Sequence, residues 1–159
     1  MKTLTQPEQV TLTINGEPRN VIIYPGETLL YTLRGDALGL TGAKPGCENG
    51  DCGACTVLID HMPVKSCMML TAEVENRSIT TVEGLEDTPI QKAFVQKSAF
   101  QCGYCTSGFL MVGHALSQHV TSPDDGRIVE WLRSNICRCT GYEEILDAVH
   151  SVCRENSQP

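Results

Sequence analysis

The distribution of cysteine constrains this chain more than any other feature of its sequence. Three cysteines fall within the twelve residues "GCENGDCGACTV", which begin at Gly46. The chain has nine cysteines in 159 residues: Cys47, Cys52, Cys55, Cys67, Cys102, Cys105, Cys137, Cys139 and Cys153. They divide into a first set of four, a second set of four and one cysteine left over. We therefore expect the fold to gather four thiols at each of two places.

Composition argues against a disulfide scaffold. Hydrophobic residues make up 41% of the chain and charged residues 19%, which is typical of a globular protein with a core. The first residues, "MKTLTQPEQVTLTING", contain neither the apolar segment of a secretory signal nor a twin arginine, so we expect a cytoplasmic location. Disulfides are disfavoured there, and an odd number of cysteines cannot all pair. Metal binding is the better interpretation.

Charge and hydropathy exclude two classes of partner. The net charge is −7 and the pI is near 5.0, whereas nucleic acids and anionic membranes favour clustered lysine and arginine. An apolar run of about 18 residues, which would span a bilayer, does not occur in the sequence. We expect neither a nucleic-acid nor a membrane partner.

The first half of the chain has the pattern of a small sheet. Alternating apolar residues lead into Asn15-Gly16, a strong signal for a hairpin. Helical spacing follows over residues 29–37, and a second hairpin is predicted to turn at "DHMP". "SITTVEGL" then predicts a last strand. These elements predict a small mixed sheet that packs against one helix.

The second half has the start signals of helices. Thr88, with Pro89 after it and Gln91 three residues later, predicts a capped helix start. Ser122 and Thr140 predict two more starts, and another helix should open around residues 103–106. Four helices are therefore expected. The predicted fold is α+β, with a sheet domain over residues 8–84 and a helical domain over residues 85–155.

The first cysteine set has a diagnostic spacing. Cys47, Cys52 and Cys55 follow C-x4-C-x2-C, with Cys67 further along, which is the plant-type ferredoxin arrangement for a [2Fe-2S] cluster. The glycines among these cysteines let the backbone bend around a cluster and direct N–H groups at its sulfurs. A zinc site usually has two short cysteine pairs instead. A Rieske centre would need two histidines near the cysteines, and the sequence places only His61 there.

The second cysteine set is less specific. Cys102 and Cys105 lie in "QCGYCTSG", and Cys137 and Cys139 lie in "NICRCTGY"; this spacing also fits zinc. Cys105 falls at a predicted helix start, and the Thr140 cap would place Cys139 immediately before another. Two helix N-termini would then direct positive dipole ends at one anionic group. This placement favours a second cluster and leaves zinc open.

The motifs "GCENGDCGACTV", "QCGYCTSG" and "NICRCTGYEEI" together resemble the iron–sulfur subunit or N-terminal domain of the xanthine dehydrogenase (molybdenum hydroxylase) family, over about residues 8–152. The resemblance implies a β-grasp plant-type ferredoxin domain followed by a four-helix domain, each with one [2Fe-2S] cluster. It assigns the first cluster to Cys47, Cys52, Cys55 and Cys67, and the second to Cys102, Cys105, Cys137 and Cys139.

The resemblance also implies partners. A large subunit would hold a molybdenum–pterin cofactor, where substrate is hydroxylated, and a medium subunit would hold FAD. Electrons would run from molybdenum to the helical-domain cluster, then to the ferredoxin-domain cluster and then to FAD. Gln101 is implied to contact the pterin. The implied assembly is a dimer of heterotrimers, and the substrate is a purine such as xanthine or hypoxanthine first, or another N-heterocycle or an aldehyde.

Some residues depart from the pattern or lie outside it. Glu48 stands where the family commonly has glycine, although glutamate tolerates left-handed backbone poorly. Cys153 lies on an apolar helical stripe and is expected to be a buried small hydrophobe. Met68 and Met69 are expected to fill the core around the first cluster. Catalytic acid–base pairs and phosphate loops do not accompany the cysteines, so the chain is expected to carry electrons. The rival interpretations are a stand-alone two-cluster carrier and a zinc-stabilised interaction module.

Overall fold

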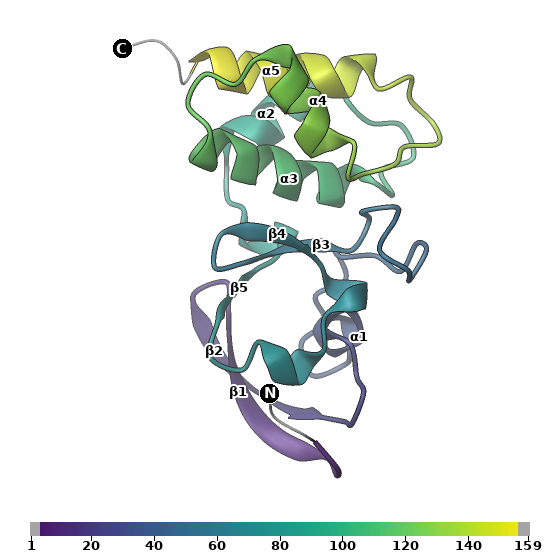
Figure 1. The fold of residues 1–159 in the computed structure, drawn as a ribbon, viewed down its shortest axis with the longest axis vertical. Helices are drawn as coiled ribbons and strands as arrows, with labels where there is room; N and C mark the ends of the chain where they lie inside the picture. The colour runs from purple at the N-terminus through teal and green to yellow at the C-terminus, as the bar shows by residue number, and fades with distance from the viewer. Residues whose placement is uncertain (1–3, 156–159) are drawn as a thin grey trace.

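The computed structural model of the chain describes residues 4–155 as a sheet half followed by a helical half (Figure 1). The strands are β1 (Glu8–Ile14), β2 (Glu17–Ile23), β3 (Thr56–Ile59), β4 (Met62–Lys65) and β5 (Ser78–Thr80). The α-helices are α1 (Leu29–Arg34), α2 (Pro89–Gln96), α3 (Thr106–His119), α4 (Asp125–Leu132) and α5 (Glu143–Glu155). Three short 3-10 helices are η1 (Ser66–Met68), η2 (Thr71–Glu73) and η3 (Val82–Gly84). The predicted α+β fold is confirmed.

The five strands form one mixed sheet in the order β2-β1-β5-β3-β4. β1 pairs with β2 antiparallel and with β5 parallel, and β3 pairs antiparallel with both β5 and β4. Asn15 and Gly16 have φ of 52° and 82°, which suits the tight turn between two twisted antiparallel strands. Asp60 and His61 make the second turn with φ of 48° and 69°. Both predicted hairpins are confirmed.

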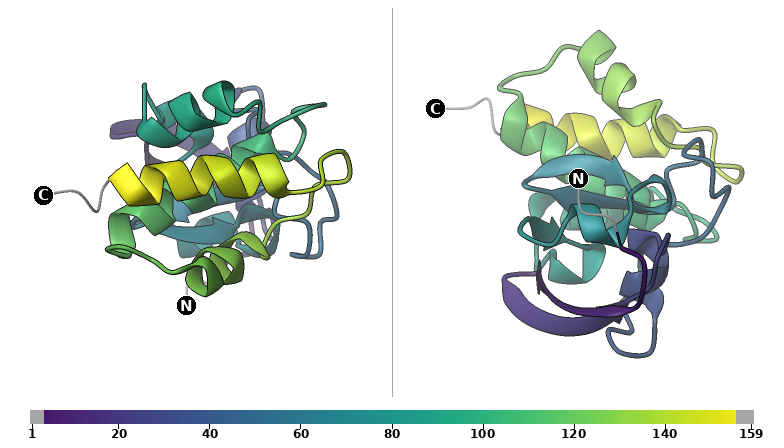
Figure 2. Two further views of the ribbon diagram at one scale, coloured as in Figure 1. Left: turned by 90° about the horizontal axis from the view of Figure 1, so that it is seen from above. Right: turned by 60° about the horizontal axis from the view of Figure 1, so that its bottom comes forward.

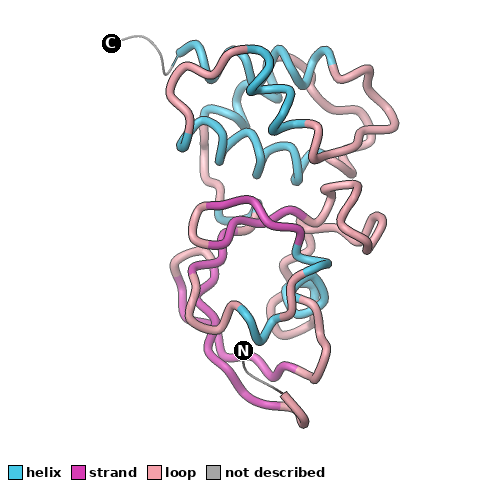
Figure 3. Tube along the Cα trace, in the orientation of Figure 1, coloured by secondary structure: helices cyan, strands magenta, loops and turns pink. Residues whose placement is uncertain are grey.

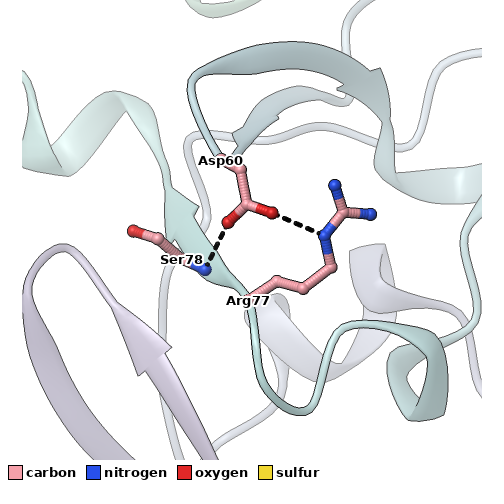
Figure 4. A network of polar contacts seen from close by, with 3 residues as sticks. All are labelled: Asp60, Arg77 and Ser78. Carbon is pink, nitrogen blue, oxygen red and sulfur yellow. Dashed lines mark hydrogen bonds and ion pairs between the residues drawn. The ribbon is translucent and has the colours of Figure 1, made fainter.

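The second turn is tied to β5 by a carboxylate (Figure 4). Asp60 Oδ2 accepts a hydrogen bond from Arg77 Nε at 2.7 Å, and Asp60 Oδ1 accepts one from the Ser78 backbone N–H at 2.9 Å. These donors, the arginine first, lower the pKa of the Asp60 carboxyl from its ordinary value. The turn that precedes β4 is thereby fixed to the centre of the sheet.

Each half has its own hydrophobic core. In the sheet half, buried residues of β1, β2, α1 and β3 pack together, with Leu12, Ile23 and Leu29 fully enclosed. In the helical half, α5 lies over α3 and is flanked by α2 and α4 (Figure 2, left). α3 lies along β3 and β4, so this helix also contacts the sheet half (Figure 1). The domain limits at residues 84 and 85 stay a prediction.

The helix starts were predicted with mixed success. α2 begins at Pro89, directly after Thr88, and Gln91 Oε1 accepts a hydrogen bond from the Thr88 N–H, as predicted. The Ser122 cap was wrong: α4 begins at Asp125, and the Asp124 carboxylate accepts from the Arg127 N–H at 2.7 Å. An aspartate two residues later supplies the same kind of acceptor and therefore moves the cap.

The Thr140 cap was also wrong, because α5 begins at Glu143. The Thr140 N–H donates to Cys137 Sγ, and Tyr142 has a φ of 70°, so the chain still curves around the cysteines at these residues. Among residues 4–155, none of the helices has the length and apolar character needed to cross a bilayer.

Candidate metal centres

The first cysteine set lies mainly on the long loop between α1 and β3. Cys47 and Cys52 are partly exposed, Cys55 is buried just before β3, and Cys67 is buried in η1 beyond the β3–β4 hairpin. A Cβ added at Gly46 would lie 2.6 Å from Cys52 Sγ, so only glycine fits there. The structure thus brings all four predicted thiols to one end of the sheet half.

Backbone N–H groups surround the first thiols. The Cys52 N–H donates to Cys47 Sγ at 3.3 Å. Burial raises the pKa of the Cys47 thiol, but N–H groups from Asn49, Cys52 and Asp51 outweigh it and lower that pKa to about 7. Burial raises the pKa of Cys67 to about 11, with the nearby Cys55 thiol adding to the effect. The loop therefore stabilises negative charge on sulfur at its exposed side.

Glu48 has a φ of 56°, so it takes the left-handed conformation that glycine would adopt more readily. Its carboxylate accepts a hydrogen bond from the Tyr31 hydroxyl at 2.7 Å. This bond joins the loop to α1 and helps hold glutamate in a conformation that it tolerates poorly. The loop therefore keeps a tight path at this departure from the family pattern.

The second cysteine set lies on two loops of the helical half. Cys102 is exposed, and Cys105 is the N-cap of α3, as predicted. Cys137 is buried and Cys139 is exposed on the loop between α4 and α5. The expectation that Cys139 directly precedes a helix was wrong, because α5 starts only at Glu143. One helix N-terminus, that of α3, therefore begins beside this set.

Hydrogen bonds to sulfur also occur in the second set. The Thr140 N–H donates to Cys137 Sγ at 3.3 Å, and the Cys137 N–H donates to the Tyr142 hydroxyl at 2.9 Å. Burial raises the pKa of the Cys137 thiol, yet hydrogen bonds from Thr140 outweigh it, and the net shift is downward. Burial, followed by the Cys137 thiol, raises the pKa of Cys105 to about 12.

The two sets border one cavity. Loops from both halves meet at one side of the molecule (Figure 3), where a cavity of about 280 Å³ lies. Two thiols of the first set and all four of the second line it: Cys47, Cys52, Cys102, Cys105, Cys137 and Cys139. The Ile136 N–H donates to the Cys52 carbonyl at 2.9 Å, so a backbone hydrogen bond joins a cysteine of the first set to the residue before Cys137.

A buried asparagine closes the junction between the halves. Asn135 is 2% exposed, and its Nδ2 donates to the Gly53 carbonyl at 3.1 Å. Gly108 of α3 approaches the same carbonyl so closely that an added Cβ would overlap the Gly53 oxygen. Lys65 donates to Asn135 Oδ1 from the sheet half. Side chains and backbone therefore lock the two cysteine-bearing loops together.

The thiols associate in pairs within each set. Cys102 Sγ and Cys139 Sγ lie 3.4 Å apart. Neighbouring thiols also act on the pKa values within three further pairs: Cys137 on Cys105, Cys52 on Cys47, and Cys55 on Cys67. Over residues 4–155, no group of three or more Cys, His, Asp or Glu gathers where a single metal ion could bind. Two pairs per set fit a cluster of two irons and four cysteines, whereas zinc takes four ligands around one ion.

Other predicted residues lie as follows. Gln101 is exposed next to Cys102, on the surface beside the second set. Cys153 is buried at 4% exposure in the helical core, where burial raises its pKa. The expectation for Met68 was wrong: it is 62% exposed, because η1 turns its side chain outward beside Gly50. Met69 packs partly buried against the sheet core, as expected.

The sequence alone did not single out Lys65, Asn135 or Gly108. The only local signals are a lysine and an asparagine each two residues before a cysteine, and a glycine in an apolar helical stretch. Their roles arise from contacts between residues more than fifty positions apart, which periodicity does not encode.

Comparisons with known proteins agree with this arrangement. Residues 12–85 match the family described as a 2Fe-2S iron-sulfur cluster binding domain, and residues 81–150 match the family described as a [2Fe-2S] binding domain. The nicotine 6-hydroxylase small subunit of Paenarthrobacter nicotinovorans is 46% identical over 144 residues, covering 89% of this chain and 87% of that protein. The nicotinate dehydrogenase small FeS subunit of Eubacterium barkeri is 40% identical over 144 residues, covering 88% of this chain and 91% of that protein.

A solved structure has the same fold. A chain of quinoline 2-oxidoreductase from Pseudomonas putida 86 superposes with a TM-score of 0.88 at 40% identity, covering 96% of this chain and 97% of that one. The relatives are named as subunits, which supports the presence of partner subunits. With its two [2Fe-2S] binding domains, the chain therefore belongs to the molybdenum hydroxylase family, which includes xanthine dehydrogenase, as the small iron–sulfur subunit of an oxidoreductase complex.

Proposed function

We propose that this chain passes electrons from a molybdenum–pterin site on a large partner subunit, through two [2Fe-2S] clusters, to FAD on a medium partner subunit. The first cluster would be held by Cys47, Cys52, Cys55 and Cys67, and the second by Cys102, Cys105, Cys137 and Cys139. The observation that carries the proposal is the shared cavity, because six of these eight thiols line it. Two sites that border one cavity suit passage of single electrons between them.

The exposure of the thiols supports the proposed direction of electron flow, from the large partner subunit to the second site and then to the first. Cys102 and Cys139 are exposed, so the second site is open to a partner at that surface. The first site is deeper on the Cys55 and Cys67 side and is partly open on the Cys47 and Cys52 side. The molybdenum–pterin cofactor would supply the oxidation of substrate, and this chain would supply the cysteine pairs and the N–H groups that stabilise added charge on sulfur.

Gln101 is proposed to contact the pterin. Its exposed position directly before Cys102 lets the amide face a partner while the thiol faces a cluster. Loss of one buried hydrogen bond of this kind costs about 1–3 kcal/mol of local interaction. Gln101→Leu in the assembled complex should keep iron and assembly, yet slow reduction of the clusters by substrate. Reduction by a chemical donor should stay unchanged, and equal slowing by both donors would remove Gln101 from this role.

An N-heterocycle is the proposed substrate class. Relatives are named for nicotine, nicotinate and caffeine, and a solved structure for quinoline; the shared chemistry is a ring that contains nitrogen. A purine such as xanthine belongs to this class, and a relative is named as part of a probable xanthine dehydrogenase. An aldehyde is the second candidate, because a relative is named an aldehyde oxidoreductase, of which the alignment covers 16%. The complex is proposed to be a dimer of heterotrimers.

Removing single thiols tests the electron-transfer assignment. The purified chain should contain about four iron and four sulfide ions, since each cluster has two irons. Cys52→Ala and Cys139→Ala should each remove a different one of the two paramagnetic signals that appear on reduction. A wild-type chain with zinc and no iron would overturn the proposal. A chain that retains both clusters but isolates without a larger subunit from its native host would indicate a stand-alone carrier.

A further inference from the structure

Lys65 lies where the two halves of the chain meet. It ends β4, and its ammonium donates a hydrogen bond to the Thr56 hydroxyl at 3.2 Å within the sheet half. The same ammonium donates to the Ser134 carbonyl at 2.7 Å and to Asn135 Oδ1 at 3.3 Å in the helical half. Three acceptors drawn from two halves therefore hold this cation in one place, unlike a lysine that moves freely in solvent.

The charge of Lys65 is fixed by these bonds without being neutralised by them. All three acceptors are uncharged oxygens. Burial lowers the pKa of the Lys65 ammonium overall, because negative charge on the thiols of the first set, Cys55 foremost, offsets burial only in part. A half-buried cation acts on neighbouring charges more strongly than one in water, because the effective dielectric constant around it is lower.

We propose that Lys65 is the fixed positive charge that makes the first site the better electron acceptor of the two. The inference rests on the proposed function, since it assumes a [2Fe-2S] cluster in each cysteine set. An added electron makes a thiolate-bound cluster more negative, and a cation held nearby stabilises that state. The step moves one electron from the second site to the first and needs no proton or other reactant.

The position of the ammonium supports an unequal effect on the two sites. Lys65 lies two residues before Cys67 and pairs across the β3–β4 ladder with Thr56, the residue after Cys55. Among the described residues of the helical half, by contrast, it reaches only Ser134 and Asn135. The bonds to Ser134 and Asn135 attach the cation to the segment that leads into Cys137, so it cannot turn away from the junction. Lys65 therefore favours reduction at the first site and directs the electron away from the second.

Redox titration of the full chain with its clusters tests this role. In Lys65→Gln and Lys65→Met, the one-electron reduction equilibrium of the first site should become at least about tenfold less favourable, which corresponds to about 59 mV for one electron. The second site should change by less than about threefold in the same titration. Lys65→Arg keeps the charge and should restore the wild-type value at the first site. Paramagnetic signals assigned with the Cys52 and Cys139 variants report each site separately.

Lys92→Gln is the matched control for charge. Lys92 lies on α2, is exposed and pairs with Asp87 at 2.7 Å, so its removal changes the net charge equally at a remote surface. The one-electron reduction equilibrium of neither site should change in Lys92→Gln. An equal response to the Lys92 and Lys65 changes would mean that only net charge matters and would overturn the inference.

The remaining outcomes are equally decisive. An unchanged first site in Lys65→Gln, or equal shifts at both sites, would refute the tuning role while leaving the two-cluster assignment intact. If both charge-free variants lose the iron of the first site, the ammonium is a structural clamp and the inference fails. Absence of iron from the wild-type chain would instead count against the proposed function, so the two failures are distinguishable.

Discussion

Gly108→Ala should push α3 away from the loop of the sheet half that holds Gly53. An added Cβ would overlap the Gly53 carbonyl oxygen and would lie 2.5 Å from Asn135 Nδ2, whereas ordinary contact begins at 3.4 Å. α3 must therefore retreat by about 0.9 Å or more, which strains the Asn135–Gly53 hydrogen bond of 3.1 Å. A backbone carbonyl cannot rotate away as a flexible side chain can.

The cost follows from three contributions. Overpacking costs about 1–3 kcal/mol. A weakened buried hydrogen bond costs about 1–3 kcal/mol more. Alanine in place of glycine within a helix returns about 0.5–1 kcal/mol. The net expectation is a loss of about 1–5 kcal/mol. Each kcal/mol lowers the melting temperature of a chain of this size by about 2–4 °C.

Gly113→Ala is the control within the same helix. Its added Cβ would lie 3.0 Å from Ile90 Cδ1 and 3.1 Å from Ile90 Cγ1, so a side chain, and not a backbone carbonyl, must give by a few tenths of an ångström. This variant should be close to wild type or slightly more stable. Thermal unfolding of both variants, followed by circular dichroism at one scan rate, checks the expectation. A Gly108→Ala variant as stable as Gly113→Ala would refute the close contact between α3 and the first-site loop.

Three further predictions follow from buried or paired side chains. Cys153→Ala should leave iron at about four per chain, because two sets of four cysteines hold it without Cys153; loss of half the iron would overturn the ligand assignment. Asn135→Ala should lower the free energy of unfolding by about 1–3 kcal/mol in chemical denaturation, because it removes the buried bond from Asn135 Nδ2 to the Gly53 carbonyl and the Oδ1 acceptor of Lys65. Ile136→Ala should change it little, and equal losses would contradict this. Asp60→Asn should lower the melting temperature near neutral pH. Because the pKa of Asp60 is lower in the folded state, the carboxylate contributes to folding stability above the unfolded pKa of about 3.9, and this contribution is lost as the pH falls through the folded pKa. A difference in melting temperature from wild type that persists in acid would refute this.

Local chemistry predicted much of the fold. Asn15-Gly16 specifies its own turn, because both residues accept the positive φ that a tight hairpin needs. Thr88 with Pro89 fixed the start of α2 for a similar reason, since the cap and the first helical residue are neighbours in sequence. The cysteine spacing likewise predicted which four thiols lie in each half, while their role as cluster ligands stays a prediction. The turn and the cap depend on neighbouring residues, and each cysteine motif is a short stretch of sequence, although each set combines two such stretches.

Competing neighbouring residues and contacts between distant residues explain the features that the sequence did not predict. Ser122 has the sequence context of an N-cap, but the Asp124 carboxylate accepts a hydrogen bond from the Arg127 N–H, so Asp124 is the N-cap of α4. Thr140 resembled a cap too, yet its N–H donates to the Cys137 sulfur instead of starting a helix. The junction around Asn135 joins residues 82 positions apart, and such a contact leaves no periodic trace in the sequence.

The hydrogen bond from Ile136 to Cys52 uses no side chain at either end. Every residue except proline carries the N–H that this bond requires, so position 136 can accept nearly any substitution during evolution without losing it. Divergent relatives can therefore inherit the same connection between their two cysteine loops while differing completely at this residue. Proline is the single replacement that selection should exclude there, and its exclusion would be the only mark that the bond leaves in an alignment.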